Sequence, residues 1–230
     1  MEFQNKLVHG ILIKRYKRFL ADIKLDDGNE IVAHCTNSGS MKSCLENGAE
    51  VFLTPVTDLK RRTKFTWEMI KINSGWVGIN TGNPNKLAFE AISAGKIPEL
   101  TGYTKIVREV FFGDSRFDIF AENETEKCFI EVKNVSLKEG KYALFPDAVT
   151  TRGQKHLKTL MEVKANGIRA VMLYIVQRSD TEVFAPAKEI DPAYAKALKL
   201  AVEAGVEVIV MQANVSPEKI ALTKKLPVEI

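Results

Sequence analysis

Two acidic residues and a lysine are the side chains of this chain best suited to chemistry. Asp118 lies in a short apolar segment at residues 116–120, and Glu131 and Lys133 lie in a second one at residues 128–133. The polar stretch between the two segments predicts a β-hairpin. Side chains two apart on a strand share a face, so Glu131 and Lys133 are expected to point the same way.

Carboxylates and an amine at strand ends predict a metal-assisted reaction at a phosphate. Mg²⁺ or Mn²⁺ is typically held by one or two carboxylates together with waters and substrate phosphate oxygens. A bound ion would polarise a phosphodiester and activate a water, and Lys133 would position that water or offset developing charge. The alternative is a surface strand with a cross-strand ion pair.

Composition limits the class of protein. The chain has 230 residues, 45% apolar residues and a net charge of +4, which suits one large domain or two small ones. No apolar run is long enough to cross a bilayer, and the first residues do not resemble a signal peptide. The three scattered cysteines fit a reducing cytoplasm. His34, Cys35 and Cys44 lack a fourth zinc ligand at a usual spacing, so ordinary buried thiols are favoured.

The first 80 residues predict an all-β domain. Apolar and polar residues alternate over most of residues 7–25, and a turn signal at residues 26–28 precedes a further strand at residues 30–34. More strands are expected at residues 50–56, 64–72 and 76–79. Short strands this close together predict a small closed barrel such as an OB-fold over residues 1–80.

Residues 81–230 predict a three-layer α/β domain. Helices are expected at residues 83–94, 151–166 and 192–204, each beside a Pro, Thr, Asn, Asp or Gly boundary signal. Strands are expected at residues 106–112, in the hairpin, and at residues 169–176 and 206–211. Helices alternating with buried strands favour a sheet covered on both faces.

The order of these elements matches the restriction-endonuclease-like, PD-(D/E)xK arrangement. In several branches of that superfamily, an acidic residue on the first helix completes the metal shell. Glu90 is the candidate here, with a solvated helix glutamate as the alternative. Arg108 and Glu109 form a further candidate pair at the start of the next strand.

Basic and polar residues in three places are candidates for contacts with nucleic acid. A basic groove with aromatic residues suits single strands, and a helix N-terminus favours phosphate. The alternatives are a charged strand face, a plain turn and ordinary helix capping. The candidates are Arg15, Lys17 and Arg18 in the first strand, His34, Asn37 and Ser40 in the following loop, and Arg152, Gln154, Lys155 and His156 in the second helix.

Several longer motifs carry a resemblance to a known family. They are RYKRFLAD at residues 15–22, AHCTNSGSM at residues 33–41, SRFD at residues 115–118, EVKNV at residues 131–135 and FPDAVTTRGQKHL at residues 145–157. Together they closely resemble the SfsA family, the sugar fermentation stimulation proteins, over nearly the whole chain.

The resemblance implies an N-terminal OB-like barrel joined to a nuclease-like domain. It also implies a DNA-binding protein of weak sequence preference, linked to the regulation of sugar and especially maltose metabolism. Asp118, Glu131 and Lys133 match the nuclease-like motif of the family. The expected function is therefore DNA binding with an Mg²⁺- or Mn²⁺-dependent phosphodiesterase centre. The rival is a non-catalytic DNA-binding regulator that retains the nuclease fold.

Overall fold

Alternating apolar residues in the N-terminal part of the chain build a closed β-barrel. The computed structural model describes residues 1–58 and 60–230. The barrel strands are β1 (Val8–Tyr16), β2 (Leu20–Leu25), β3 (Glu30–His34), β4 (Glu50–Pro55) and β5 (Phe65–Ile72), followed by β6 (Gly75–Gly78). They follow the order β3-β2-β1-β4-β5-β6, and a parallel pairing of His34 with Thr66 joins β3 to β5 and closes the barrel.

The barrel has its own apolar core. Leu12, Ile23, Leu53 and Trp67 come from four different strands and are fully buried inside it. The indole Nε1 of Trp67 donates to the carbonyl oxygen of Met69 at 2.9 Å, so burial of the ring leaves no unpaired polar group there. The OB-like barrel predicted for the first domain is confirmed.

A six-stranded mixed sheet forms the centre of the second domain. Its order is β15-β14-β12-β9-β8-β7, and β9, β12 and β14 are parallel neighbours. The strands are β7 (Lys105–Phe112), β8 (Ser115–Glu122), β9 (Lys127–Val135), β12 (Arg169–Val176), β14 (Glu207–Val215) and β15 (Ile220–Lys225). On β12, Val171, Leu173 and Ile175 face one apolar core and alternate residues face the other.

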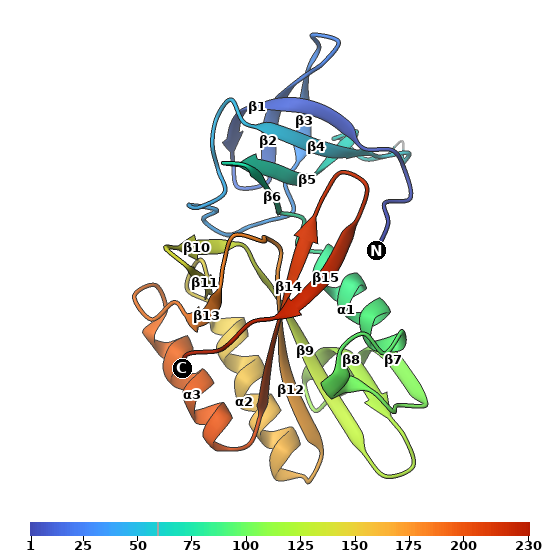
Figure 1. Ribbon diagram of the computed structural model, residues 1–230, viewed down its shortest axis with the longest axis vertical. Coiled ribbons are helices and arrows are strands. Elements are labelled where there is room, and N and C mark those ends of the chain that lie inside the picture. Colours follow the sequence, from blue (N-terminus) through green and yellow to red (C-terminus); the bar gives the residue numbers. More distant parts are fainter. Residues whose placement is uncertain (59) are drawn as a thin grey trace.

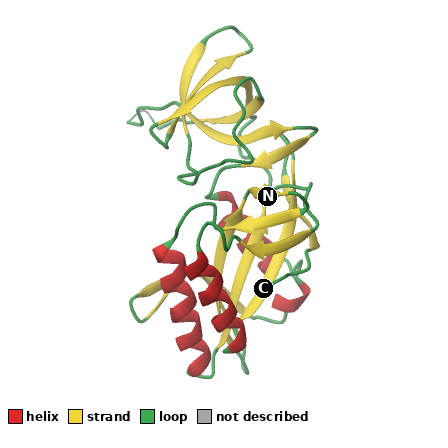
Figure 2. Cartoon of the chain, turned by 90° about the vertical axis from the view of Figure 1, so that its left-hand side faces the viewer, coloured by secondary structure: helices red, strands yellow, loops and turns green. Residues whose placement is uncertain are grey.

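Helices cover both faces of this sheet. Helix α1 (Asn83–Ser93) packs on one face, followed by the short helix η1 (Pro98–Leu100), while α2 (Thr151–Ala165) and α3 (Pro192–Glu203) lie side by side on the other (Figure 2). Thr150 and Asp191 cap α2 and α3 by accepting from the backbone amides of Gly153 and Tyr194. The predicted three-layer α/β domain is confirmed.

Four strands have no counterpart among the predicted elements. They are β15 and the members of a small sheet of order β10-β11-β13, namely β10 (Leu137–Glu139), β11 (Tyr142–Phe145) and β13 (Val183–Pro186). Each strand of the small sheet has only three or four residues, too few to show an alternating pattern. Their pairing depends on the long-range parallel contact between β11 and β13.

The two domains are in direct contact, with the barrel stacked above the α/β domain (Figure 1). The backbone amide of Gly78 donates to the carbonyl oxygen of Gln177 at 2.8 Å, and the Ser43 hydroxyl donates to the carbonyl oxygen of Ser136 at 3.2 Å. Met1 exchanges backbone hydrogen bonds with Ile220, so the first residues belong to the edge of the second domain rather than to the barrel.

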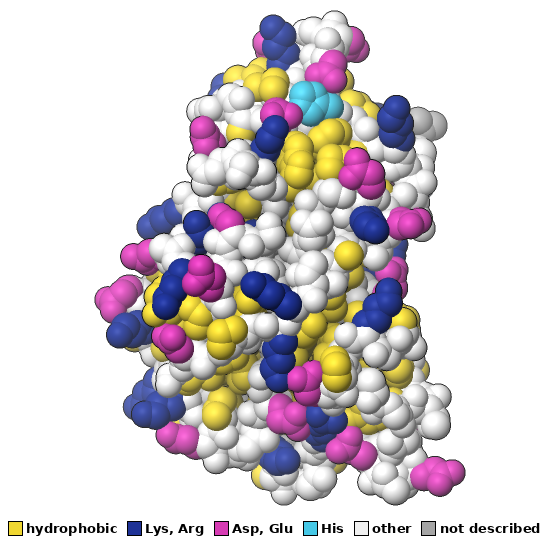
Figure 3. Space-filling model, viewed as in Figure 1, with side chains coloured by type: hydrophobic (Ala, Val, Ile, Leu, Met, Phe, Trp, Pro, Cys, Tyr) yellow, Lys and Arg dark blue, Asp and Glu magenta, His cyan; other side chains and the backbone are white. Residues whose placement is uncertain are grey.

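The surface carries both signs of charge. On the face shown in Figure 3, basic and acidic side chains are interspersed, so among the coloured side chains this face offers no continuous basic stripe. Within the part of the chain that the structure describes, no helix has the length and apolar character needed to cross a membrane.

Candidate metal centre

Asp118 lies where two central strands separate. Strands β8 and β9 pair as far as Ile119 and Ile130, and beyond that point Oδ2 of Asp118 accepts from the backbone amide of Val132 at 2.8 Å. On the other side, the register of β7 with β8 is unshifted, but Asp118 and the opposite residue Glu109, which has a φ of 58°, are not paired. The bond to Val132 holds the Asp118 carboxylate at the end of the β8–β9 ladder.

Glu131 and Lys133 share a face of β9, as predicted from their spacing. Ile130 and Val132 face the core on the α1 side, so Glu131 points toward α2. Glu131 is only 2% exposed. Its Oε1 accepts from the Lys133 amine at 2.5 Å and is also bonded to Nδ1 of His156, from α2.

Asp118 joins the cluster through electrostatics rather than through a direct bond. Its Oδ1 accepts from the amide of Asn85 on α1 at 2.6 Å. Among the described residues, it makes no hydrogen bond to Glu131 or Lys133. Burial and the negative charge of Glu131 raise the pKa of Asp118 to about 6. The charges of Glu131 and Lys133 therefore both act on the Asp118 carboxylate.

Glu131 stays ionised because its partners stabilise the charged carboxylate. Its burial alone would raise the pKa, but the bonds to His156 and Lys133 outweigh that effect and hold the pKa below its ordinary value. The site thus contains one carboxylate that is firmly ionised and one that is protonated in acid.

The donor set fits a divalent cation. Oε2 of Glu131 is buried and has no hydrogen-bond partner, a costly state that a cation would relieve. Across residues 1–58 and 60–230, no group of three or more His, Cys, Asp or Glu side chains is placed to hold a metal. Two carboxylates are nonetheless sufficient for Mg²⁺ or Mn²⁺, which keeps waters and phosphate oxygens in its shell.

Acid is expected to weaken metal binding at this site. Because Asp118 has a pKa of about 6, a cation must displace its proton below that pH. We expect Mn²⁺ affinity, measured by calorimetry, to rise about tenfold per unit below about pH 6 and to level off above it. The variant Asp118→Asn should lose this slope. An affinity for wild-type protein that stays constant from about pH 5 to about pH 7 would contradict the assignment of Asp118.

Both domains match models of one protein family. Residues 13–79 match the SfsA N-terminal OB domain, and residues 82–219 match the sugar fermentation stimulation protein RE domain. The chain belongs to the SfsA family. Sugar fermentation stimulation protein homologs from Geobacter sulfurreducens and Geobacter metallireducens are 52% and 50% identical, over 96% of both chains and 99% of both chains respectively.

A solved SfsA structure has the same architecture. The SfsA protein of Pyrococcus furiosus, solved in complex with Ca²⁺, is 31% identical to this SfsA-family chain. It superposes with a TM-score of 0.90 over 100% of this chain and 98% of its own. The paired arrangement of barrel and α/β domain is therefore shared between the two proteins.

The barrel residues predicted to contact nucleic acid lie at or near the loop that follows β3. Arg15 donates to the carbonyl oxygens of Asn37 and Gly39, and Arg18 donates to that of Ser38, so both arginines brace the loop after β3. The side chain of Lys17 makes no ion pair or hydrogen bond within the described residues, although its backbone carbonyl oxygen accepts from Phe19. The remaining candidates are His34, at the end of β3, and Asn37 and Ser40 in the loop. The ring of His34 stacks on Phe19, and the Ser40 hydroxyl is buried with no hydrogen-bond partner among the described residues.

Two of the four α2 candidates, Gln154 and His156, bond to carboxylates within the α/β domain. Gln154 donates to both carboxylate oxygens of Asp191, and His156 is 5% exposed and bonded to Glu131. The half-buried Gln154 and the buried His156 thus already bond to carboxylates of the protein. Lys155 pairs with Asp114 at the surface, and Arg152 lies 3.5 Å from Nε2 of His156.

Asn85, rather than Glu90, is the α1 residue that reaches the cluster. Glu90 is exposed and pairs with the amino group of Met1 and with Lys86. Five residues separate Asn85 from Glu90, which places them on different sides of the helix. Arg108 and Glu109 also point elsewhere, toward the ring of Phe89 and toward Arg116. An asparagine gives no metal signal in a sequence, so its role was visible only in the structure.

Proposed function

We propose that this protein binds DNA and hydrolyses phosphodiester bonds with the help of Mg²⁺ or Mn²⁺. The observation that carries the proposal is the buried and unpartnered Oε2 of Glu131, next to a second carboxylate and a lysine. Asp118 and Glu131 would hold the ion. When bound, the ion supplies Lewis-acid polarisation of the phosphate and lowers the pKa of a coordinated water.

The other side chains of the site would orient the two carboxylates and neutralise charge on the phosphate. Lys133 reaches Glu131 and lies 3.4 Å from Nδ1 of His156, so its amine is placed to meet a phosphate oxygen or to hold the attacking water. His156 fixes the Glu131 carboxylate from the α2 side, and Asn85 fixes that of Asp118 from the α1 side. Such supporting contacts keep ligands in the geometry that a cation requires.

The family relationship supports the same proposal. The Pyrococcus furiosus relative was solved with Ca²⁺, a hard cation that prefers oxygen ligands as Mg²⁺ does. The N-terminal barrel belongs to an OB family, and OB-folds commonly bind oligonucleotides. A link to sugar metabolism rests on the names of the relatives, which describe a phenotype and no reaction.

Cleavage of DNA tests the proposal directly. Plasmid and single-stranded DNA are incubated with millimolar Mg²⁺ or Mn²⁺ and wild-type protein, Asp118→Ala or the control Glu203→Ala, which changes an exposed carboxylate at the end of α3. We expect the wild type and Glu203→Ala to cleave and Asp118→Ala to be inactive. Cleavage by all three would point to a contaminant, and cleavage by none would remove the catalytic claim.

A second candidate function is DNA binding without cleavage. It is favoured by the lack, among the described residues, of a metal-holding group of three or more His, Cys, Asp or Glu side chains. It predicts retention of fluorescently labelled DNA by wild-type protein and Asp118→Ala alike, with affinity that falls as salt rises. The cleavage assay separates the two candidates.

A further inference from the structure

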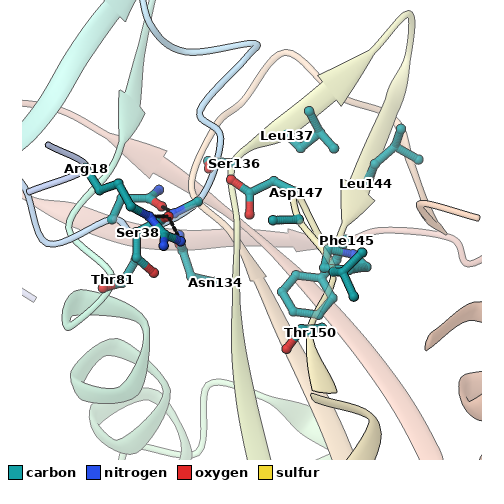
Figure 4. Close-up of a pocket in the computed structure, with 15 residues that line it drawn as sticks. Arg18, Ser38, Thr81, Asn134, Ser136, Leu137, Leu144, Phe145, Asp147 and Thr150 are labelled. Atoms are coloured by element: carbon teal, nitrogen blue, oxygen red, sulfur yellow. Dashed lines mark hydrogen bonds between the residues drawn. The ribbon is translucent and has the colours of Figure 1, made fainter. Parts of the chain in front are cut away.

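A cavity of about 260 Å³ lies between the two domains. The barrel supplies Arg18 and the loop at Asn37, and the α/β domain supplies Asn134 and the segment from Phe145 to Thr150 (Figure 4). Pockets for drug-sized ligands commonly measure about 300–1,000 Å³, so this one suits a smaller group.

Two walls of the cavity belong to elements that also carry the metal centre. Asn134 directly follows Lys133 on β9 and lies three residues, about 10 Å along the strand, beyond Glu131. Thr150 is the N-cap of α2, the helix that brings His156 to Glu131. The cavity therefore lies further along the same strand and helix as Glu131 and His156.

One side of the cavity is apolar. Leu144, Phe145 and Pro146 contribute to it, and Val149, which is 68% exposed, stands at its edge. The ring of Phe145 is braced by Tyr174 and Tyr194, with ring centroids 5.6 Å and 5.1 Å away. A braced aromatic ring beside proline suits stacking of a planar group.

Two amide groups that line the cavity have donors without a partner among the described residues. Oδ1 of Asn37 accepts from the backbone amide of Gly39 at 2.9 Å, and its Nδ2 makes no hydrogen bond within the described part of the chain. Oδ1 of the half-buried Asn134 accepts from Gln177 at 2.8 Å, and its Nδ2 is likewise unused there. A ligand with carbonyl oxygens would accept from these amides.

We propose that the cavity receives one unpaired base of a single-stranded nucleic acid, and that the adjoining phosphate lies at the Asp118–Glu131 site. The inference rests on the proposed function, since it names the substrate of the same site. A base in a duplex is stacked on both faces and paired along one edge, so only an unpaired or flipped base can enter a pocket of this size. Arg18 and the N-terminus of α2 flank the cavity and favour the neighbouring phosphates.

Filling the cavity tests this proposal without any need for cleavage. Binding is measured by fluorescence anisotropy in EDTA, with a labelled oligothymidylate and with a sugar-phosphate strand of equal length that lacks bases. We expect the wild type to prefer the strand with bases about tenfold or more, in line with stacking energies per base. The variant Ala148→Phe fills the cavity and should lose this preference while it keeps its affinity for the strand without bases.

Two further variants complete the test. Ala193→Phe adds the same ring at an exposed position of α3 and should behave as the wild type. Asn134→Asp keeps the acceptor for Gln177 and removes the free donor, so it should lower the preference even if Ala148→Phe fails to fold. A preference that survives in every folded cavity variant, or is missing in the wild type, overturns the proposal. Binding of neither strand would instead contradict the DNA-binding function itself.

Discussion

Replacement of Lys133 by Met is expected to lower the rate of DNA cleavage by about 10²–10³ while metal binding is retained. The Lys133 amine bonds to Glu131 at 2.5 Å and its side chain is 13% exposed, so it is placed beside the cation site and partly shielded from water. A positive charge there stabilises the negative charge that develops on a phosphate oxygen in the transition state. Cleavage rates at saturating Mn²⁺ measure this loss.

The affinity of Lys133→Met for the metal ion should rise or stay unchanged. In the absence of metal, Lys133 helps to neutralise Glu131, and its charge opposes the approach of a second cation. Mn²⁺ titration of Lys133→Met should therefore show an affinity equal to or above that of the wild type. A lower cleavage rate together with unchanged Mn²⁺ affinity distinguishes a role in the transition state from the role of a metal ligand.

The matched control is Lys127→Met, which removes an exposed lysine at the start of the same strand. We expect its cleavage rate and its Mn²⁺ affinity to equal those of the wild type. If Lys133→Met and Lys127→Met cleave equally well, Lys133 has no part in the chemistry. If Lys133→Met instead loses Mn²⁺ binding, its role is to preserve the site rather than to act in the reaction.

The fold was largely predictable because its boundaries carry local signals. Helices α2 and α3 begin at side-chain caps, Thr150 and Asp191, that bond to the amides of Gly153 and Tyr194. The spacing of Glu131 and Lys133 on one strand likewise predicted their shared face. Features of this kind depend on neighbours in the sequence, and a single chain is sufficient to detect them.

The contacts that complete the site could not be predicted in this way. His156 meets Glu131 across 25 residues, and its burial depends on how α2 is rotated against the sheet. Asn85 rather than Glu90 faces Asp118 for the same reason, since both lie near the edge of the apolar stripe of α1. Asn37 and Asn134, whose amide donors have no partner among the described residues, line one cavity only because the two domains dock.

Replacement of Arg178 by Met is expected to destabilise the protein by about 3 kcal/mol. Arg178 follows β12, is 2% exposed, and forms two bonds of 2.7 Å and 2.9 Å with Asp180. Its Nη1 also donates to the carbonyl oxygen of Ser136 at 2.8 Å and to the Ser43 hydroxyl at 3.2 Å. Methionine fills part of the space but leaves the buried carbonyl with fewer donors, and this loss accounts for most of the cost.

The effect should be concentrated at the boundary between the domains, because Ser43 belongs to the barrel side and Ser136 follows β9. The two tryptophans, Trp67 and Trp76, lie on β5 and β6 of the barrel sheet, so tryptophan fluorescence reports its unfolding. Far-ultraviolet dichroism reports the helices, which all lie in the second domain within the described residues. In urea, the two signals of the wild type should change together, whereas those of Arg178→Met should separate and shift to lower concentrations.

The control Arg116→Met, at a side chain that is 52% exposed, should change stability by no more than about 0.5 kcal/mol. Coincident transitions in Arg178→Met at the wild-type midpoint would show that the domains are held together by their apolar contacts alone.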